Sequence, residues 1–81
     1  MDTIHTDNVP AQTLEETRGD FRVMGWPFVE TKFCDVKAGH MQWVTEIKVF
    51  RPDMIEKLWF KGRHNNAELF WVGQIRDPKA A

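Results

Sequence analysis

Apolar and polar residues alternate most clearly over residues 41–50, and this alternation predicts a β-strand. One face of it carries Met41, Trp43, Thr45, Ile47 and Val49. Residues 28–36 predict a second strand, with Val29, Thr31 and Phe33 on one face. The loop at 37–40 has the length of a hairpin turn, and Gly39 is free to adopt positive φ there. We expect an antiparallel pair with one face in the core and the other half-solvated.

Two aromatic clusters, residues 58–60 and 69–72, flank a polar, turn-forming segment. Residues 68–75 are predicted to form a strand, but residues 53–61 fit two structures. As a helix, they would begin after Pro52 and end at Gly62, with an apolar stripe of Met54, Ile55, Leu58 and Trp59.

As a strand, residues 55–61 would follow a turn at 51–54 and pair with residues 67–75 across the loop at 62–66. The adjacent charges Glu56 and Lys57 interrupt strand alternation, which favours a second helix at 53–61.

The N-terminal part predicts a short helix over residues 10–18. Thr13 and Glu16 have the spacing of a capping box, and Gly19 stands where the helix would stop. Residues 21–24 then predict a short strand before a break at 25–27. We expect an α+β protein: a flexible tail at 1–9, a single domain at 10–76 with an antiparallel sheet of three to five strands, and a frayed end at 77–81.

Aromatic residues are unusually frequent for the length of this chain. Four Trp and six Phe occur among 81 residues. A domain of this size buries only about 60% of the surface that its unfolded chain exposes. We therefore expect more aromatic side chains than the core can hide.

The sequence excludes several classes of protein. Cys34 is the only cysteine, so an intramolecular disulfide is impossible, and we expect this thiol to be a small buried residue. The N-terminus lacks the basic and apolar regions of a signal peptide, and no apolar run is long enough to span a membrane. These features predict a cytoplasmic protein.

No group of residues matches a catalytic, cofactor or metal motif. Cys34, Asp35 and His40 lie around one loop, but zinc ligands come in closely spaced pairs, which are absent. The glycines follow no phosphate-loop pattern, and the carboxylates are scattered. We expect a non-enzymatic protein without cofactor or metal.

Basic and aromatic residues concentrate over residues 48–63, where five basic side chains accompany two acidic ones. Such a mixture is typical of an interface hot spot and also of single-stranded nucleic-acid binding. The candidate binding residues are Arg51, Lys57, Trp59, Lys61, Arg63, His64 and Trp71.

The leading hypothesis is a small protein-interaction module that acts by binding a larger partner, as an inhibitor or regulatory protein does. Phages and other mobile elements commonly produce small proteins of this kind. The alternative is a nucleic-acid-binding domain that uses segment 48–63. A homodimer through an exposed strand edge is a further expectation about partners.

Overall fold

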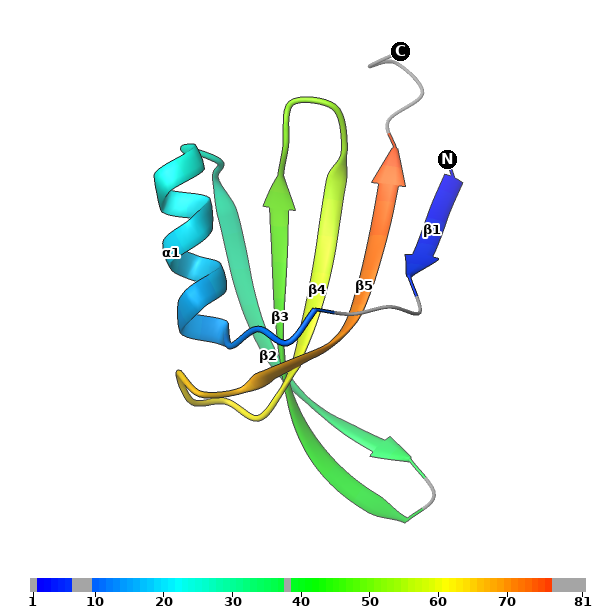
Figure 1. Ribbon diagram of the computed structural model, residues 1–81. Coiled ribbons are helices and arrows are strands. Elements are labelled where there is room, and N and C mark those ends of the chain that lie inside the picture. The colour runs from blue at the N-terminus through cyan, green and yellow to red at the C-terminus, as the bar shows by residue number, and fades with distance from the viewer. Residues whose placement is uncertain (1, 7–9, 38, 77–81) are drawn as a thin grey trace.

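Five strands form one antiparallel sheet in the computed structural model, which describes residues 2–6, 10–37 and 39–76 (Figure 1). The spatial order of the strands is β1-β5-β4-β3-β2. The elements are β1 (Asp2–Thr6), α1 (Leu14–Met24), β2 (Phe28–Lys37), β3 (His40–Phe50), β4 (Ile55–Lys61) and β5 (Glu68–Arg76). The predicted α+β class, with an N-terminal helix and three to five strands, is confirmed.

The hairpin of β2 and β3 follows the predicted alternation. Phe33 lies opposite Val44, and Ile47 lies opposite Glu30. Gly39 adopts the expected positive φ of 79° in the turn. Residues 40–42 pair with β2, and pairing of β3 with β4 begins at Val44, just after a hydrogen bond from the Gly62 amide to the Trp43 carbonyl. The end of this hairpin therefore extends past the other strands as a two-stranded arm (Figure 1).

Residues 55–61 form strand β4, so the predicted second helix at 53–61 is wrong and the hairpin alternative is confirmed. Glu56 and Lys57 do not interrupt the alternation. Glu56 faces the same side as Leu58 and Phe60, while Lys57 faces the other side with Trp59. Glu56 is a charged residue on the buried side of the strand, so the apolar pattern did not indicate a strand there. In the folded protein its carboxylate contacts Gln74 and Arg51.

Helix α1 begins at the predicted capping box, so residues 10–13 precede the helix rather than forming its start, and it ends later than predicted. The Thr13 side chain accepts a hydrogen bond from the Glu16 amide, and the Glu16 carboxylate accepts one from the Thr13 amide. The helix continues through Gly19 and includes residues 21–24, so the predicted stop and the predicted strand are both wrong. Burial of Phe21 in the core stabilises this additional turn. The helix ends at Gly25, which adopts a left-handed φ of 74°.

Residues 2–6 form β1, paired with β5 from Asp2 opposite Arg76 to Thr6 opposite Val72. This corrects the prediction of a flexible tail at 1–9 for these five positions. A short polar strand is held mainly by backbone hydrogen bonds to its neighbour. Its sequence therefore shows no alternation of apolar residues from which the strand could be predicted. Positions 1 and 7–9, and the frayed end predicted at 77–81, lie outside the described residues.

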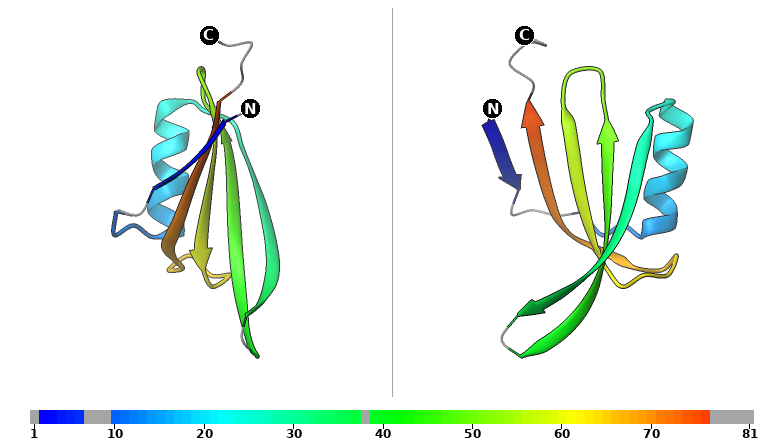
Figure 2. Two further views of the ribbon diagram at one scale, coloured as in Figure 1. Left: turned by 90° about the vertical axis from the view of Figure 1, so that its right-hand side faces the viewer. Right: turned by 180° about the vertical axis from the view of Figure 1, so that it is seen from behind.

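The core lies between α1 and one face of the sheet. Leu14 and Phe21 of the helix pack against Ile47, Val49, Leu58, Phe60, Ala67, Leu69 and Val72. Backbone hydrogen bonds join the start of the helix to the β4–β5 loop: the Leu14 amide donates to Ala67 and the Glu15 amide to Asn65. The two views in Figure 2 show α1 on one side of the sheet only. We call the opposite side the helix-free face.

Candidate functional site

Four aromatic rings form a continuous cluster on the helix-free face. Trp59 is central, and its ring centroid lies 4.5 Å from that of Trp71, 5.4 Å from Phe33 and 6.3 Å from Phe70. The Phe33 contact is edge-to-face, a geometry favoured by the ring quadrupoles. These four residues come from three strands, and we call them the aromatic cluster.

A β-bulge in the β4–β5 hairpin places two of these rings on one side. Trp59 lies opposite Trp71, but the next residue, Phe60, lies opposite Leu69. Phe70 is therefore an extra residue without a partner in the ladder. In regular alternation Phe70 would face away from Trp71. The bulge instead turns both rings toward Trp59.

Polar and steric contacts fix the orientation of the two indoles. The Trp59 Nε1 donates a hydrogen bond of 2.7 Å to Oε2 of Glu46, its cross-strand neighbour. The Trp71 ring lies over Gly73, whose missing side chain leaves room for it. These contacts hold both rings in place.

Every ring of the aromatic cluster keeps part of its surface exposed. Of the ten aromatic residues only Phe21 and Phe60 are buried, which confirms that the core cannot hide them all. Val29, on the same face, is 55% exposed. Within the described residues no helix or second sheet covers this face (Figure 2). A solvated sheet face is ordinarily polar, so this one is unusual.

Charged side chains of both signs lie on the helix-free face. Lys48 and Lys57 lie directly opposite each other, and the Lys61 Nζ lies 5.6 Å from the centre of the Phe70 ring. Asp35, Glu46 and Glu68 lie on the same face, by strand alternation and cross-strand pairing. Among the side chains that the structure describes on this face, there are thus three lysines and three carboxylates.

The structure brings together four of the seven predicted binding residues: Lys57, Trp59, Lys61 and Trp71. Arg51 lies in the β3–β4 loop, with its guanidinium 4.6 Å from the centre of the Trp26 ring. Arg63 lies in the β4–β5 loop, 4.8 Å from the centre of the Trp43 ring, and His64 is exposed in that loop. The basic segment 48–63 therefore does not form one surface.

Sequence reasoning missed Phe33, Phe70 and Glu46 as parts of the site. The alternation of residues 28–36 placed Phe33 on the same face as Val29. The sequence did not show that Phe33 lies opposite Val44, and this pairing sets its position on the face. No local signal predicts the bulge that turns Phe70. Cys34 is exposed on the hairpin arm, which corrects the expectation that it is buried.

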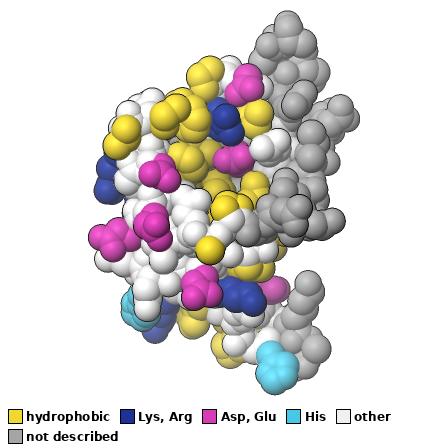
Figure 3. Space-filling view, viewed as in Figure 1, with side chains coloured by type: hydrophobic (Ala, Val, Ile, Leu, Met, Phe, Trp, Pro, Cys, Tyr) yellow, Lys and Arg dark blue, Asp and Glu magenta, His cyan; other side chains and the backbone are white. Residues whose placement is uncertain are grey.

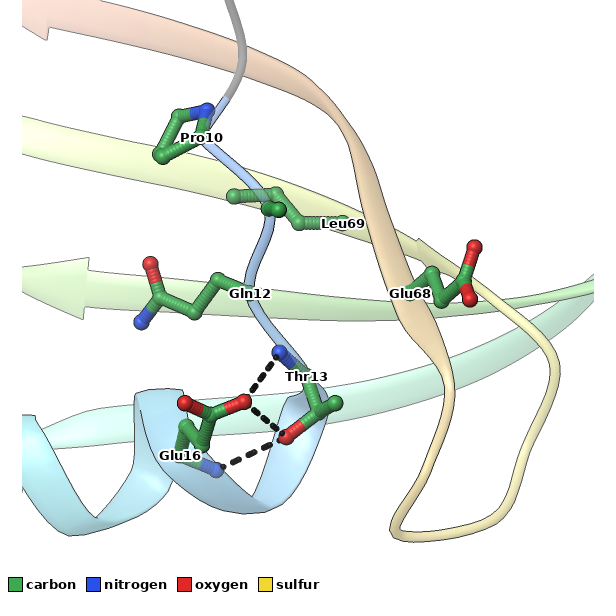
Figure 4. A pocket seen from close by; sticks show the side chains of 7 residues that line it. Pro10, Gln12, Thr13, Glu16, Glu68 and Leu69 are labelled. Carbon is green, nitrogen blue, oxygen red and sulfur yellow. Dashed lines mark hydrogen bonds between the residues drawn. The ribbon is translucent and has the colours of Figure 1, made fainter.

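The helix side of the sheet has two open hollows beside the segment that leads into α1. Figure 3 shows hydrophobic side chains gathered on this side, with acidic and basic ones among them. One hollow lies around Pro10, Thr13 and Leu69, and Figure 4 shows the capping box at its edge. Within that box the Oε1 atom of Glu16 accepts hydrogen bonds from the amide and the hydroxyl of Thr13. The second hollow contains Arg51 and Glu56.

One ion pair anchors α1 to strand β2. The Arg18 guanidinium donates from Nε and Nη2 to the two carboxylate oxygens of Glu30, and from Nη1 to Asn65 at 2.7 Å. The hydrogen bond from Arg18 lowers the pKa of Glu30 and raises that of Arg18. This pair positions the helix and lies apart from the aromatic cluster.

The described part of the chain lacks two further features. It contains no group of three or more His, Cys, Asp or Glu side chains placed to hold a metal ion. None of its helices has the length and apolar character needed to cross a membrane. The chain matches no family model, and no curated protein or solved structure matches it.

Proposed function

We propose that this protein is a non-enzymatic interaction module that binds a larger partner protein through its helix-free face. The observation that carries the proposal is the aromatic cluster, in which three rings surround Trp59 and all four stay partly exposed on the sheet. Exposed apolar patches of this kind mark interaction sites, and Trp is the residue most enriched at hot spots. The protein would act as an inhibitor or regulatory subunit by occupying its partner.

The balance of charge supports a protein partner over nucleic acid. Nucleic acid is held mainly by cations on phosphates, whereas three carboxylates accompany the three lysines among the described side chains of this face. Arg51 and Arg63 lie elsewhere, each over its own indole ring. A mixed polar rim around an apolar centre is the anatomy of a protein interface.

Two exposed valines provide a matched test. Val29 lies on the helix-free face, and Val23, which is 87% exposed, lies on α1. Val29→Glu places a carboxylate in the proposed interface, whereas Val23→Glu adds the same charge outside it. We expect Val29→Glu to weaken binding of a captured partner about tenfold or more, and Val23→Glu to change it less than about twofold.

The measurement is capture from a cell lysate with each immobilised variant, followed by titration of the captured protein. Capture that survives Val29→Glu unchanged, or that Val23→Glu abolishes, would contradict the proposal. Both positions are exposed, so both variants should fold. A thermal melt of each one checks this.

Nucleic-acid binding is the second candidate, because Lys57 and Lys61 lie on the same face as the stacked rings. It predicts that Lys57→Gln and Lys61→Gln each weaken binding to a single-stranded oligonucleotide and each reduce the slope against salt by about one unit. An oligonucleotide that does not bind at low salt removes this candidate.

The single, exposed Cys34 supports a reducing compartment such as the cytoplasm as the place of action.

A further inference from the structure

Glu56 occupies a position on β4 where an apolar residue would continue the core. It faces the helix side with Leu58 and Phe60 and is only 9% exposed. The Gln74 Nε2 donates to its Oε2 at 2.9 Å, and the Arg51 Nη1 lies 3.6 Å from the same oxygen. Within the described residues, no hydrogen bond reaches its Oε1. One oxygen of a buried carboxylate therefore has acceptor capacity left over.

This carboxylate lines an open pocket of about 360 Å³ on the helix side of the sheet. The volume is within the range of small-molecule sites. Leu58, Leu69 and Val72 supply an apolar surface, with Phe21 and Trp26 beside it. The polar lining residues come from different elements: Gln12, Asp20, Arg51, Glu56 and Gln74. The pocket thus combines an apolar body with a small set of hydrogen-bonding groups.

The charge of the pocket selects the sign of its ligand. Two carboxylates, Asp20 and Glu56, face one guanidinium, that of Arg51. The Arg51 Nε is buried and the guanidinium lies against the Trp26 ring, so Arg51 presents little of its charge to the pocket. Gln12 donates to Asp20 at 3.3 Å but does not neutralise it. Among the described lining residues the surplus is one negative charge.

We propose that this pocket binds a small amphipathic cation, an ammonium group on an aromatic or aliphatic body. The ammonium donates to Oε1 of Glu56, and the body packs on Leu58, Leu69 and Val72. This site lies on the opposite side of the sheet from the aromatic cluster. It is therefore independent of the function proposed for the helix-free face.

Three probes of one shape test the charge requirement: phenethylammonium, the neutral phenethyl alcohol and the anion phenylacetate. Trp26 lines the pocket, so its indole ¹H–¹⁵N NMR signal, assigned with a Trp26→Phe variant, reports binding. We expect phenethylammonium to shift this signal in a saturable way. Its dissociation constant should be at least about tenfold lower than that of either other probe.

Glu56→Gln should weaken phenethylammonium binding about tenfold or more, because the charged acceptor is lost. Asp53→Asn removes the same charge from an exposed position in the β3–β4 loop and should leave binding unchanged. No shift up to about 10 mM phenethylammonium, or tighter binding of phenylacetate, would overturn the proposal. The comparison of probes on the unaltered protein remains decisive if Glu56→Gln fails to fold.

Discussion

The indole of Trp71 lies over Gly73, its neighbour but one on the same face of β5. A Cβ atom built on Gly73 would come within 2.3 Å of Cη2 and 2.8 Å of Cζ2 of this ring. The glycine is required for the space that it leaves, and the ring position in the aromatic cluster depends on it.

Gly73→Ala is expected to lower the free energy of unfolding by about 1–3 kcal/mol, because the added methyl group overlaps the indole and forces it to move. Urea denaturation measures the loss. The near-ultraviolet circular dichroism should also change, since Trp71 and Trp59 have centroids only 4.5 Å apart. Equal stability of the variant and the unaltered protein would show that the ring moves freely.

Gly19→Ala is expected to have the opposite effect. Gly19 lies inside α1, and nothing is within 4 Å of a Cβ built there. Alanine restricts the unfolded chain and favours the helix, so the free energy of unfolding should rise by about 0.5–1 kcal/mol. The same urea titration measures it. A loss of stability would argue against a continuous helix from Leu14 to Met24.

Thr13→Ala should destabilise the start of α1. The Thr13 Oγ1 accepts a hydrogen bond from the Glu16 amide, which otherwise has no partner in the first turn. The expected loss in the free energy of unfolding is about 0.5–2 kcal/mol, measured by thermal or urea unfolding. Thr13→Ser keeps the acceptor oxygen and should retain most of the stability. An equal loss in both variants would mean that the hydroxyl does not act as the cap.

The Arg18–Glu30 pair predicts a loss of stability in acid. The hydrogen bond from Arg18 holds the pKa of Glu30 below that of an unfolded glutamate, which is about 4.3. Its contribution is therefore fully present above the unfolded pKa and is lost as the pH falls through the lower folded pKa. Urea unfolding as a function of pH should show a smaller acid loss for Glu30→Gln. Asp53→Asn, at an exposed position, should follow the unaltered protein.

Patterns that are local in the sequence predicted much of the fold. The capping box at Thr13 and Glu16, the β2–β3 hairpin and the turn at Gly39 each depend on residues within a few positions of one another. Tertiary burial decided where α1 ends, because Phe21 enters the core and extends the helix beyond Gly19.

Strand β4 shows why hydrophobic periodicity was insufficient. Glu56 broke the apolar pattern, yet Gln74 and Arg51, distant in the sequence, satisfy its carboxylate. Backbone hydrogen bonds to β3 and β5 stabilise residues 55–61 in the extended conformation. A single sequence shows neither partner, so the helix was favoured.

The sequence by itself determined that aromatic residues exceed the capacity of the core, since that depends only on their number and the size of the chain. Only the tertiary structure decided where the surplus lies. Strand register brings Phe33 beside Trp59, and one bulge turns Phe70 and Trp71 to the same side. The same register distributes segment 48–63 over both faces, because successive side chains of a strand point to opposite sides.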